Sequence, residues 1–232
     1  MAPTWPFGAQ RRPVGPGVDV GVVAAGRRII GLLEQLDLRD VTLVANDSGG
    51  GIVLSALGIS GLHWSRVSRL VFTNCDSFEH FPPKSFAPLV KLCRISSVAG
   101  GLALRALATR RGLAFFKQAV TKDGIAQDRD TAIFGGFLQS ADVRREAVRF
   151  SAALNPRHTM AAEPAIGKWS KPVLVLWGTQ DDLFPVSHAE RLADAFPDAT
   201  LRHVEGSSTY VMLDRPTETA DAITAFVEGS QP

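Results

Sequence analysis

The chain has 232 residues, of which 45% are hydrophobic and 21% are charged, so it can bury one globular core. Its formal net charge of +2 shows no basic excess typical of nucleic-acid binding, and we expect no nucleic-acid partner. No apolar run reaches membrane-spanning length and the N-terminus lacks a secretory signal pattern, so we expect a cytoplasmic protein without a membrane partner.

The two cysteines, Cys75 and Cys93, form neither a metal-ligand spacing nor a disulfide framework. We interpret both as small buried hydrophobic residues. The sequence also lacks a phosphate-cradling glycine loop with a dinucleotide's acidic partner, and it lacks a cluster of metal ligands. We therefore predict no cofactor and no metal.

The first part of the chain predicts a helix, a strand and a tight turn into a second helix. Residues 1–19 are rich in Pro and Gly without periodicity and indicate an irregular lead-in. Apolar residues at helical spacing predict a helix over 22–36. Residues 41–45 form a short aliphatic strand, and a polar pair with a glycine cluster then opens a helical run over 52–57.

Three more apolar strands are predicted, at residues 67–73, 172–177 and 200–204. Helical patterns cover residues 187–196 and 217–227. Strands that alternate with helices at these distances predict an α/β fold, in which a mostly parallel sheet carries helices on both faces.

Residues 76–162 interrupt this alternation with helical, loop-broken sequence that is too long for a simple crossover. We assign them to a helical cap, and residues 1–75 and 163–232 to an α/β core. The many apolar side chains of the cap are expected to pack against the core and to line a crevice at the carboxyl ends of the strands. We expect a small apolar molecule to bind in this crevice between core and cap.

The turn after the first strand has the pattern small-x-Asp-x-small, with Ala45, Asp47 and Gly49. Small residues are expected at its ends because side chains there would collide in so tight a turn. Asp47 would project from the strand end, close to the positive end of the following helix. The alternative is an ordinary Asp/Ser helix N-cap followed by a glycine turn.

Four stretches, in order along almost the whole chain, resemble α/β-hydrolase-fold proteins with a helical cap. The resemblance is to the Asp-nucleophile branch, which includes haloalkane dehalogenases and epoxide hydrolases. The stretches are the turn at 43–50, the strand at 70–76, the strand and acid turn at 173–185, and the last strand with its loop at 204–216.

The resemblance implies that Asp47 is the nucleophile, Asp181 the supporting acid and the amide of Ser48 an oxyanion donor. Asp76 is a candidate auxiliary carboxylate, because it would lie at the same strand ends as Asp47 and Asp181. Its alternative role is to cap a turn.

Thr209 occupies the position where members of this branch carry the catalytic His. A hydroxyl cannot take a proton from water near neutral pH, so an ester on Asp47 would lack the group that drives its hydrolysis. Of the five histidines, His80 and His158 are the candidates to replace it, because cap segments can fold over the site. The other three are interpreted as surface or structural residues.

Two further departures concern the start of the chain and substrate recognition. Met1 falls where the resemblance places the connection after the family's first strands and oxyanion loop, so Val41–Ala45 would become an unpaired sheet edge. We expect residues 1–19 or a homodimer contact to cover it. Ser48 stands where dehalogenases have a halide-gripping Trp, and the only tyrosine, Tyr210, lies outside the cap that supplies the tyrosines of epoxide hydrolases.

Three functional interpretations stay open. The first is a hydrolase-type or lyase-type enzyme that acts on a small apolar substrate through Asp47. The second is a non-catalytic member of the fold that binds a ligand or a partner in the crevice. The third is a truncated product of a longer hydrolase gene.

Overall fold

The computed structural model describes residues 1–8 and 10–229. Four parallel strands form one sheet in the order β1-β2-β3-β4, so sequence order and spatial order coincide. The strands are β1 (Val41–Asp47), β2 (Val67–Cys75), β3 (Val173–Gly178) and β4 (Ala199–Val204). The predicted α/β class and all four predicted strands are confirmed.

Helices cover both faces of the sheet, as expected. One face packs against α1 (Val22–Gln35), α2 (Ser48–Leu57) and α10 (Val186–Ala195), and the other against α12 (Pro216–Glu228). The strands alternate accordingly: Phe72 and Val175 point to the first face, and Val71 and Leu174 to the second.

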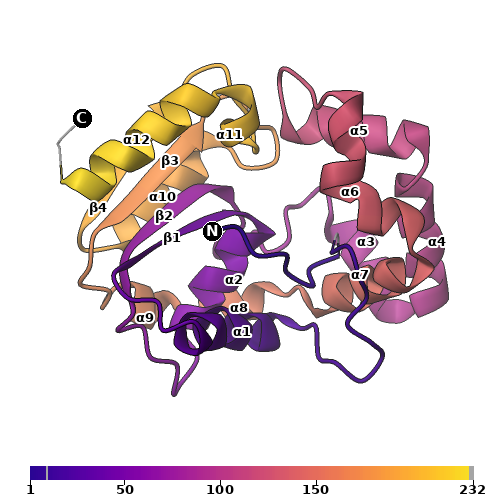
Figure 1. Cartoon of the computed structure of the whole chain (residues 1–232), viewed down its shortest axis with the longest axis horizontal. Coiled ribbons are helices and arrows are strands. Elements are labelled where there is room, and N and C mark those ends of the chain that lie inside the picture. Colours follow the sequence, from indigo (N-terminus) through magenta and orange to yellow (C-terminus); the bar gives the residue numbers. More distant parts are fainter. Residues whose placement is uncertain (9, 230–232) are drawn as a thin grey trace.

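Between β2 and β3 the described chain is entirely helical or irregular. Its helices are α3 (Ala87–Ile95), α4 (Ser97–Leu107), α5 (Arg110–Val120), η1 (Gln127–Arg129), α6 (Asp130–Gln139), α7 (Ala141–Ala153), α8 (Pro156–Met160) and α9 (Glu163–Ile166). Helices α3 to α7 gather to the right of the sheet in Figure 1, whereas α8 and α9 run back beneath α2. The division of the chain into a core and a cap at residues 76 and 162 stays a prediction.

The helical segment has apolar clusters of its own, one between α3, α4 and α7 and another between α5 and α6. Not all of its apolar side chains are buried, however. Ile95, Leu102 and Phe115 are largely exposed, which the composition of this segment did not lead us to expect.

The N-terminal lead-in is irregular, as predicted, but it is closely packed. Phe7 stacks between Trp5 and Phe150, with ring centroids 5.8 and 5.4 Å apart. Buried Glu146 of α7 accepts hydrogen bonds from the Gln10 side chain (2.6 Å) and from two backbone amides of this segment. Residues 5–8 and 10–15 are therefore fixed against the helical segment.

Strand β1 lies at the edge of the sheet. Among the described residues of the lead-in, none forms a backbone hydrogen bond with β1, so the lead-in does not extend the sheet. A homodimer contact through Val41–Ala45 stays a prediction.

The close approach at the β1–α2 turn lies one residue later than we expected. A Cβ added at Gly49 would have no heavy atom within 4 Å, apart from its chain neighbours and the backbone of its own helix. The expected collision there is therefore wrong. A Cβ at Gly50 would lie 2.3 Å from Cys75, and one at Gly51 would lie 2.8 Å from the ring of Phe81. These two glycines let α2 start directly against the end of β2.

We predict that Gly50→Ala destabilises the fold by about 1–3 kcal/mol, because the added methyl overlaps Cys75 and the backbone must shift. The matched control, Gly49→Ala, should be neutral or slightly stabilising because alanine favours the helix. Urea unfolding of both variants measures the difference. Equal stability of the two would show that α2 does not pack on β2 this closely.

Candidate active site

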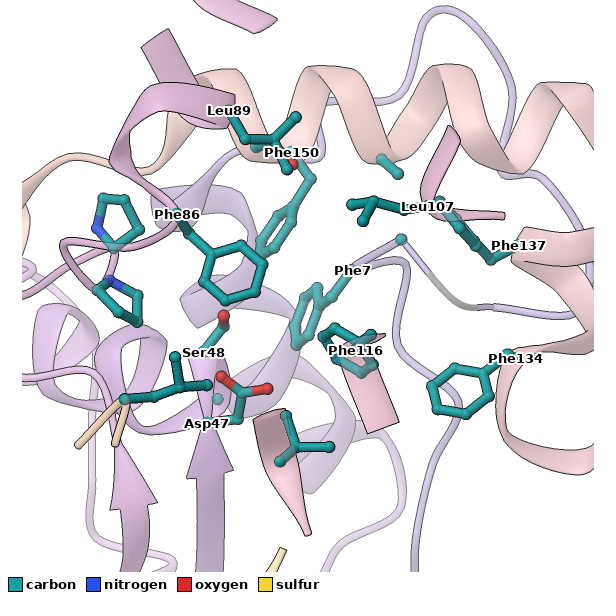
Figure 2. Close-up of a pocket in the computed structure, with 18 of the residues that line it drawn as sticks. Phe7, Asp47, Ser48, Phe86, Leu89, Leu107, Phe116, Phe134, Phe137 and Phe150 are labelled. Carbon is teal, nitrogen blue, oxygen red and sulfur yellow. The ribbon is translucent and has the colours of Figure 1, made fainter. Parts of the chain in front are cut away.

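The chain passes from β1 to α2 through Asp47, whose backbone has φ 52° and ψ −133°. A positive φ is strained for a residue with a side chain and persists only where the surroundings enforce it. Here the pairing of β1 with β2 and the close contact of α2 with Cys75 fix both sides of the turn. The strain directs the carboxylate away from the sheet and into a cavity (Figure 2).

This cavity has a volume of about 570 Å³ and lies between the strand ends and the helical segment. Its walls are mostly apolar, and Figure 2 shows Phe7, Phe86 and Phe116 around the Asp47 carboxylate. No Lys, Arg or His is among the described residues that line it. Asp47 is therefore the one charged group of the lining described here.

Burial raises the pKa of Asp47 to about 6. A hydrogen bond from the Ser48 amide opposes the shift, and the nearby charge of Asp181 adds to it. The amide that the resemblance assigns to the oxyanion therefore contacts the carboxylate of Asp47 itself. A carboxylate with this pKa is mostly ionised at neutral pH despite its apolar surroundings.

Tyr210 lines the cavity next to Asp47 and acts on its carboxylate as a hydrogen-bond donor. Burial, together with the charge of Asp47, raises the pKa of the Tyr210 phenol, so it stays protonated at neutral pH. We did not predict this role from the sequence. The signal was present in the position of Tyr210 beside Thr209, on the loop that the resemblance assigns to the site.

Asp181 lies at the end of β3 but is not among the residues that line the cavity. Its carboxylate accepts hydrogen bonds from Asn74 Nδ2 (2.8 Å), Thr209 Oγ1 (2.9 Å) and the amides of Leu183 and Phe184. Burial raises its pKa, and these donors oppose the shift. Asp181 thus acts on Asp47 through its charge.

Thr209 is fully buried, and its hydroxyl donates a hydrogen bond to Asp181. It thus makes a contact with the acid from the position where the resemblance places a His. Its carbonyl lies 2.7 Å from Nδ2 of Asn46, which also contacts Oγ1 of Thr73. Asn46 and Asn74 therefore join the ends of three strands and the loop after β4. The sequence analysis missed both asparagines.

Asp76 lies beneath the first turn of α2. A Cβ added at Gly51 would be only 2.9 Å from the Cβ of Asp76. No backbone amide donates to either carboxyl oxygen within the described residues, so the turn-capping alternative is wrong; the Ser48 hydroxyl, which lowers the pKa of Asp76 somewhat, is the polar group beside it. Burial and then the charge of Asp47 hold the pKa of Asp76 well above its usual range. Asp76 does not line the cavity.

The histidines that were candidates for the base are both away from Asp47. His80 stacks on His188, with ring centroids 4.1 Å apart, and His158 lines a separate pocket beside α1 and α7. Neither belongs to the residues that line the Asp47 cavity.

Comparison with known proteins identifies the family. Residues 1–222 match the family model described as "Alpha/beta hydrolase family", and the chain belongs to this family. An uncharacterized protein of Mycobacterium tuberculosis, Rv2715, is 26% identical over 234 residues, which cover 94% of this chain and 64% of that protein. The chain thus spans less than two thirds of the length of that relative.

One named hydrolase is similar to this chain in sequence, and one solved structure is similar to it in fold. A 2-hydroxy-6-oxononadienedioate/2-hydroxy-6-oxononatrienedioate hydrolase of Dechloromonas aromatica is 24% identical over 75% of this chain and 57% of its own length. The crystal structure of an ancestral haloalkane dehalogenase superposes with a TM-score of 0.75 at 15% identity, over 93% of this chain and 77% of that one. This structural similarity establishes the fold.

The raised pKa of Asp47 makes stability depend on pH. In the unfolded chain Asp47 titrates near 4, whereas in the folded protein it titrates near 6. The folded state therefore binds this proton more tightly, and stability falls as the pH rises from about 4 to about 6. We predict that Asp47→Asn is more stable than wild type by on the order of 2 kcal/mol at pH 8, and little changed at pH 3.5.

Thermal or urea unfolding across this pH range measures the effect. Asp182→Asn is the matched control, because Asp182 is exposed beside the same loops and should leave stability unchanged at both pH values. An Asp47→Asn variant that is no more stable than wild type at pH 8 would show that the carboxylate is well solvated.

Proposed function

We propose that this member of the Alpha/beta hydrolase family is a hydrolase-type enzyme in which Asp47 attacks a small, neutral, apolar substrate. The observation that carries the proposal is a lone ionisable carboxylate, on a strained strand-to-helix turn, facing an apolar cavity of about 570 Å³. This turn acts as the nucleophile elbow, and the helices between β2 and β3 form the cap over it.

The chemistry begins with attack by one carboxylate oxygen of Asp47 on an electrophilic carbon of the substrate. A C–O bond forms, and the leaving group departs with the electron pair of the bond that breaks. The Ser48 amide holds the carboxylate, which favours attack by a defined oxygen. The Tyr210 phenol, which stays protonated, donates a hydrogen bond to the Asp47 carboxylate and helps to orient it for attack.

Hydrolysis of the resulting ester requires water to attack its carbonyl carbon. The water oxygen remains in the regenerated carboxyl group, one proton goes to the departing alkoxide and the other is released. In the family pattern a His removes the first of these protons, and Thr209 stands in its place. We therefore propose that formation of the ester outpaces its hydrolysis.

The lining of the cavity also restricts the substrate. The Dechloromonas enzyme is named for dioate substrates, which carry two carboxylates. The cavity of this chain offers no Lys, Arg or His among its described lining residues, and Asp47 would repel an anion. A neutral substrate with one polar reacting group fits this lining better than a dicarboxylate.

The second candidate function is non-catalytic binding of an apolar ligand in the same cavity. The observation that favours it is the contact of Thr209 with Asp181, which leaves the acid without a base to orient. In this case Asp47 would fix the ligand without forming a bond.

Incubation with a 1-bromoalkane, an aryl epoxide and an aryl ester, followed by intact-protein mass spectrometry, tests the proposal. We predict a persistent adduct on Asp47 from at least one probe, formed faster as the pH rises through about 6 because the carboxylate must be ionised. Asp47→Asn should form none. Absence of an adduct and of turnover with every probe would reject the nucleophile and favour the binding function.

Thr209→His tests the missing base independently. Because Thr209 already contacts Asp181, a His there gains an acid partner, and we predict that hydrolysis of the adduct accelerates by about 10²–10⁴. Thr209→Val, which cannot bond Asp181, is the control and should not accelerate it. Rapid hydrolysis by the wild type would refute the argument that the base is absent.

A further inference from the structure

Helices α3, α4 and α5 each have two apolar sides. Toward the protein, their side chains line the Asp47 cavity, including Val90 of α3, Leu104 of α4 and Phe116 of α5. The opposite sides carry apolar residues that face solvent, including Ile95, Leu102 and Phe115. A helix with apolar residues on both sides normally has a neighbour on both sides.

The exposure is concentrated in this region. Ile95 and Val98 are 72% exposed, Phe115 is 66% exposed and Leu102 is 64% exposed. Apart from the N-terminal Met1, no other large apolar side chain in the described chain is as exposed as these four. Isolated exposed apolar residues are ordinary, whereas several on adjoining helices indicate a binding surface.

The charged residues of this region are all basic. Between Glu79 and Asp123 the sequence has eight basic residues and no acidic residue. The basic residues are Lys84, Lys91, Arg94, Arg105, Arg110, Arg111, Lys117 and Lys122. Only Lys117 forms an ion pair within the described residues, with Asp130; the other seven, including Lys91, Arg105, Arg110 and Arg111, form none.

On α4 the apolar and basic residues form one stripe, because Val98, Leu102 and Arg105 are spaced at four and three residues. The stripe borders an outer groove, whose other wall is α7 with Arg145 and Arg149. The two acids of the groove are already engaged: Asp142 pairs with Arg145, and buried Glu146 holds the N-terminal lead-in. They do not neutralise Arg105.

From this pattern we propose that the outer surface of α3–α5, centred on Ile95, Val98, Leu102 and Phe115, docks on a bilayer that contains anionic phospholipid. The four side chains insert among the acyl chains near the headgroups, and the unpaired basic residues contact lipid phosphates. The helices that touch the bilayer are then the helices that line the Asp47 cavity.

A bilayer fits this surface better than an acidic protein or a nucleic acid. Binding to either of those is dominated by charge and gains little from apolar side chains that are 64–72% exposed. A bilayer uses both features, since insertion buries the apolar residues and the anionic headgroups attract the basic ones. The sequence-based expectation of no membrane partner concerned membrane-spanning segments, and this proposal revises it for peripheral binding.

The experiment is vesicle flotation of the full chain with phosphatidylcholine alone or with about one third phosphatidylglycerol. We expect at least about tenfold stronger partitioning to the anionic vesicles, and a steep loss of binding in about 0.5 M salt, because exposed charges are then screened. Val98→Asp with Leu102→Asp should reduce binding by about tenfold or more at low salt.

The matched control is Leu36→Asp. Leu36 is 48% exposed, but it lies at the end of α1, outside the outer surface of α3–α5. A second readout is an environment-sensitive fluorophore attached at Leu102→Cys, whose emission should shift to the blue on anionic vesicles only. The same label at Leu36→Cys should not respond, and the native Cys75 and Cys93 are buried.

Partitioning that is equal on both vesicle types, or that survives the paired Asp substitutions, would overturn the proposal. Binding to soluble polyglutamate as strong as that to anionic vesicles would replace the bilayer by an acidic macromolecule. Since none of these readouts involves Asp47, they are independent of the proposed chemistry. Asp47→Asn should bind vesicles like the wild type.

Discussion

The site depends on one constraint, namely that a carboxylate is kept in an apolar cavity by a strained turn. Asp47 adopts a positive φ because α2 starts directly against the end of β2, which only glycines at positions 50 and 51 permit. Without that contact the turn could relax and the carboxylate could reach water. The raised pKa of Asp47 is therefore a consequence of how the backbone is packed three and four residues later.

A conventional site of this kind combines a nucleophile with a base, whereas the described surroundings of Asp47 include no base. In the proposed chemistry the apolar lining favours attack by the carboxylate, whereas Thr209 occupies the acid-linked position without the chemistry of a base. Under this proposal the site forms a bond more readily than it breaks it. The same features would also suit a protein that holds an apolar ligand without reacting with it, and the two cases differ in whether an adduct forms.

The sequence predicted the sheet and the position of Asp47 because both depend on local patterns. Short aliphatic runs define the strands, and the small-x-Asp-x-small turn follows the first of them. It did not reveal Phe7 as a wall of the cavity, because an irregular Pro-rich segment carries no periodicity that shows where it packs. The roles of Asn46 and Asn74 likewise depend on contacts between distant strand ends. The collision assigned to Gly49 was wrong because the neighbour of α2 is β2, which spacing within the turn cannot show.

The ionisation of Asp47 tests the central claim most directly. Infrared difference spectra between the wild type and Asp47→Asn, recorded from pH 3.5 to 8, isolate the carboxylate band of this residue. Our account predicts a midpoint near 6, because burial in the cavity disfavours the charged form. A midpoint near 4, the ordinary value for an exposed aspartate, would mean that water fills the cavity around the carboxylate, and would contradict the account.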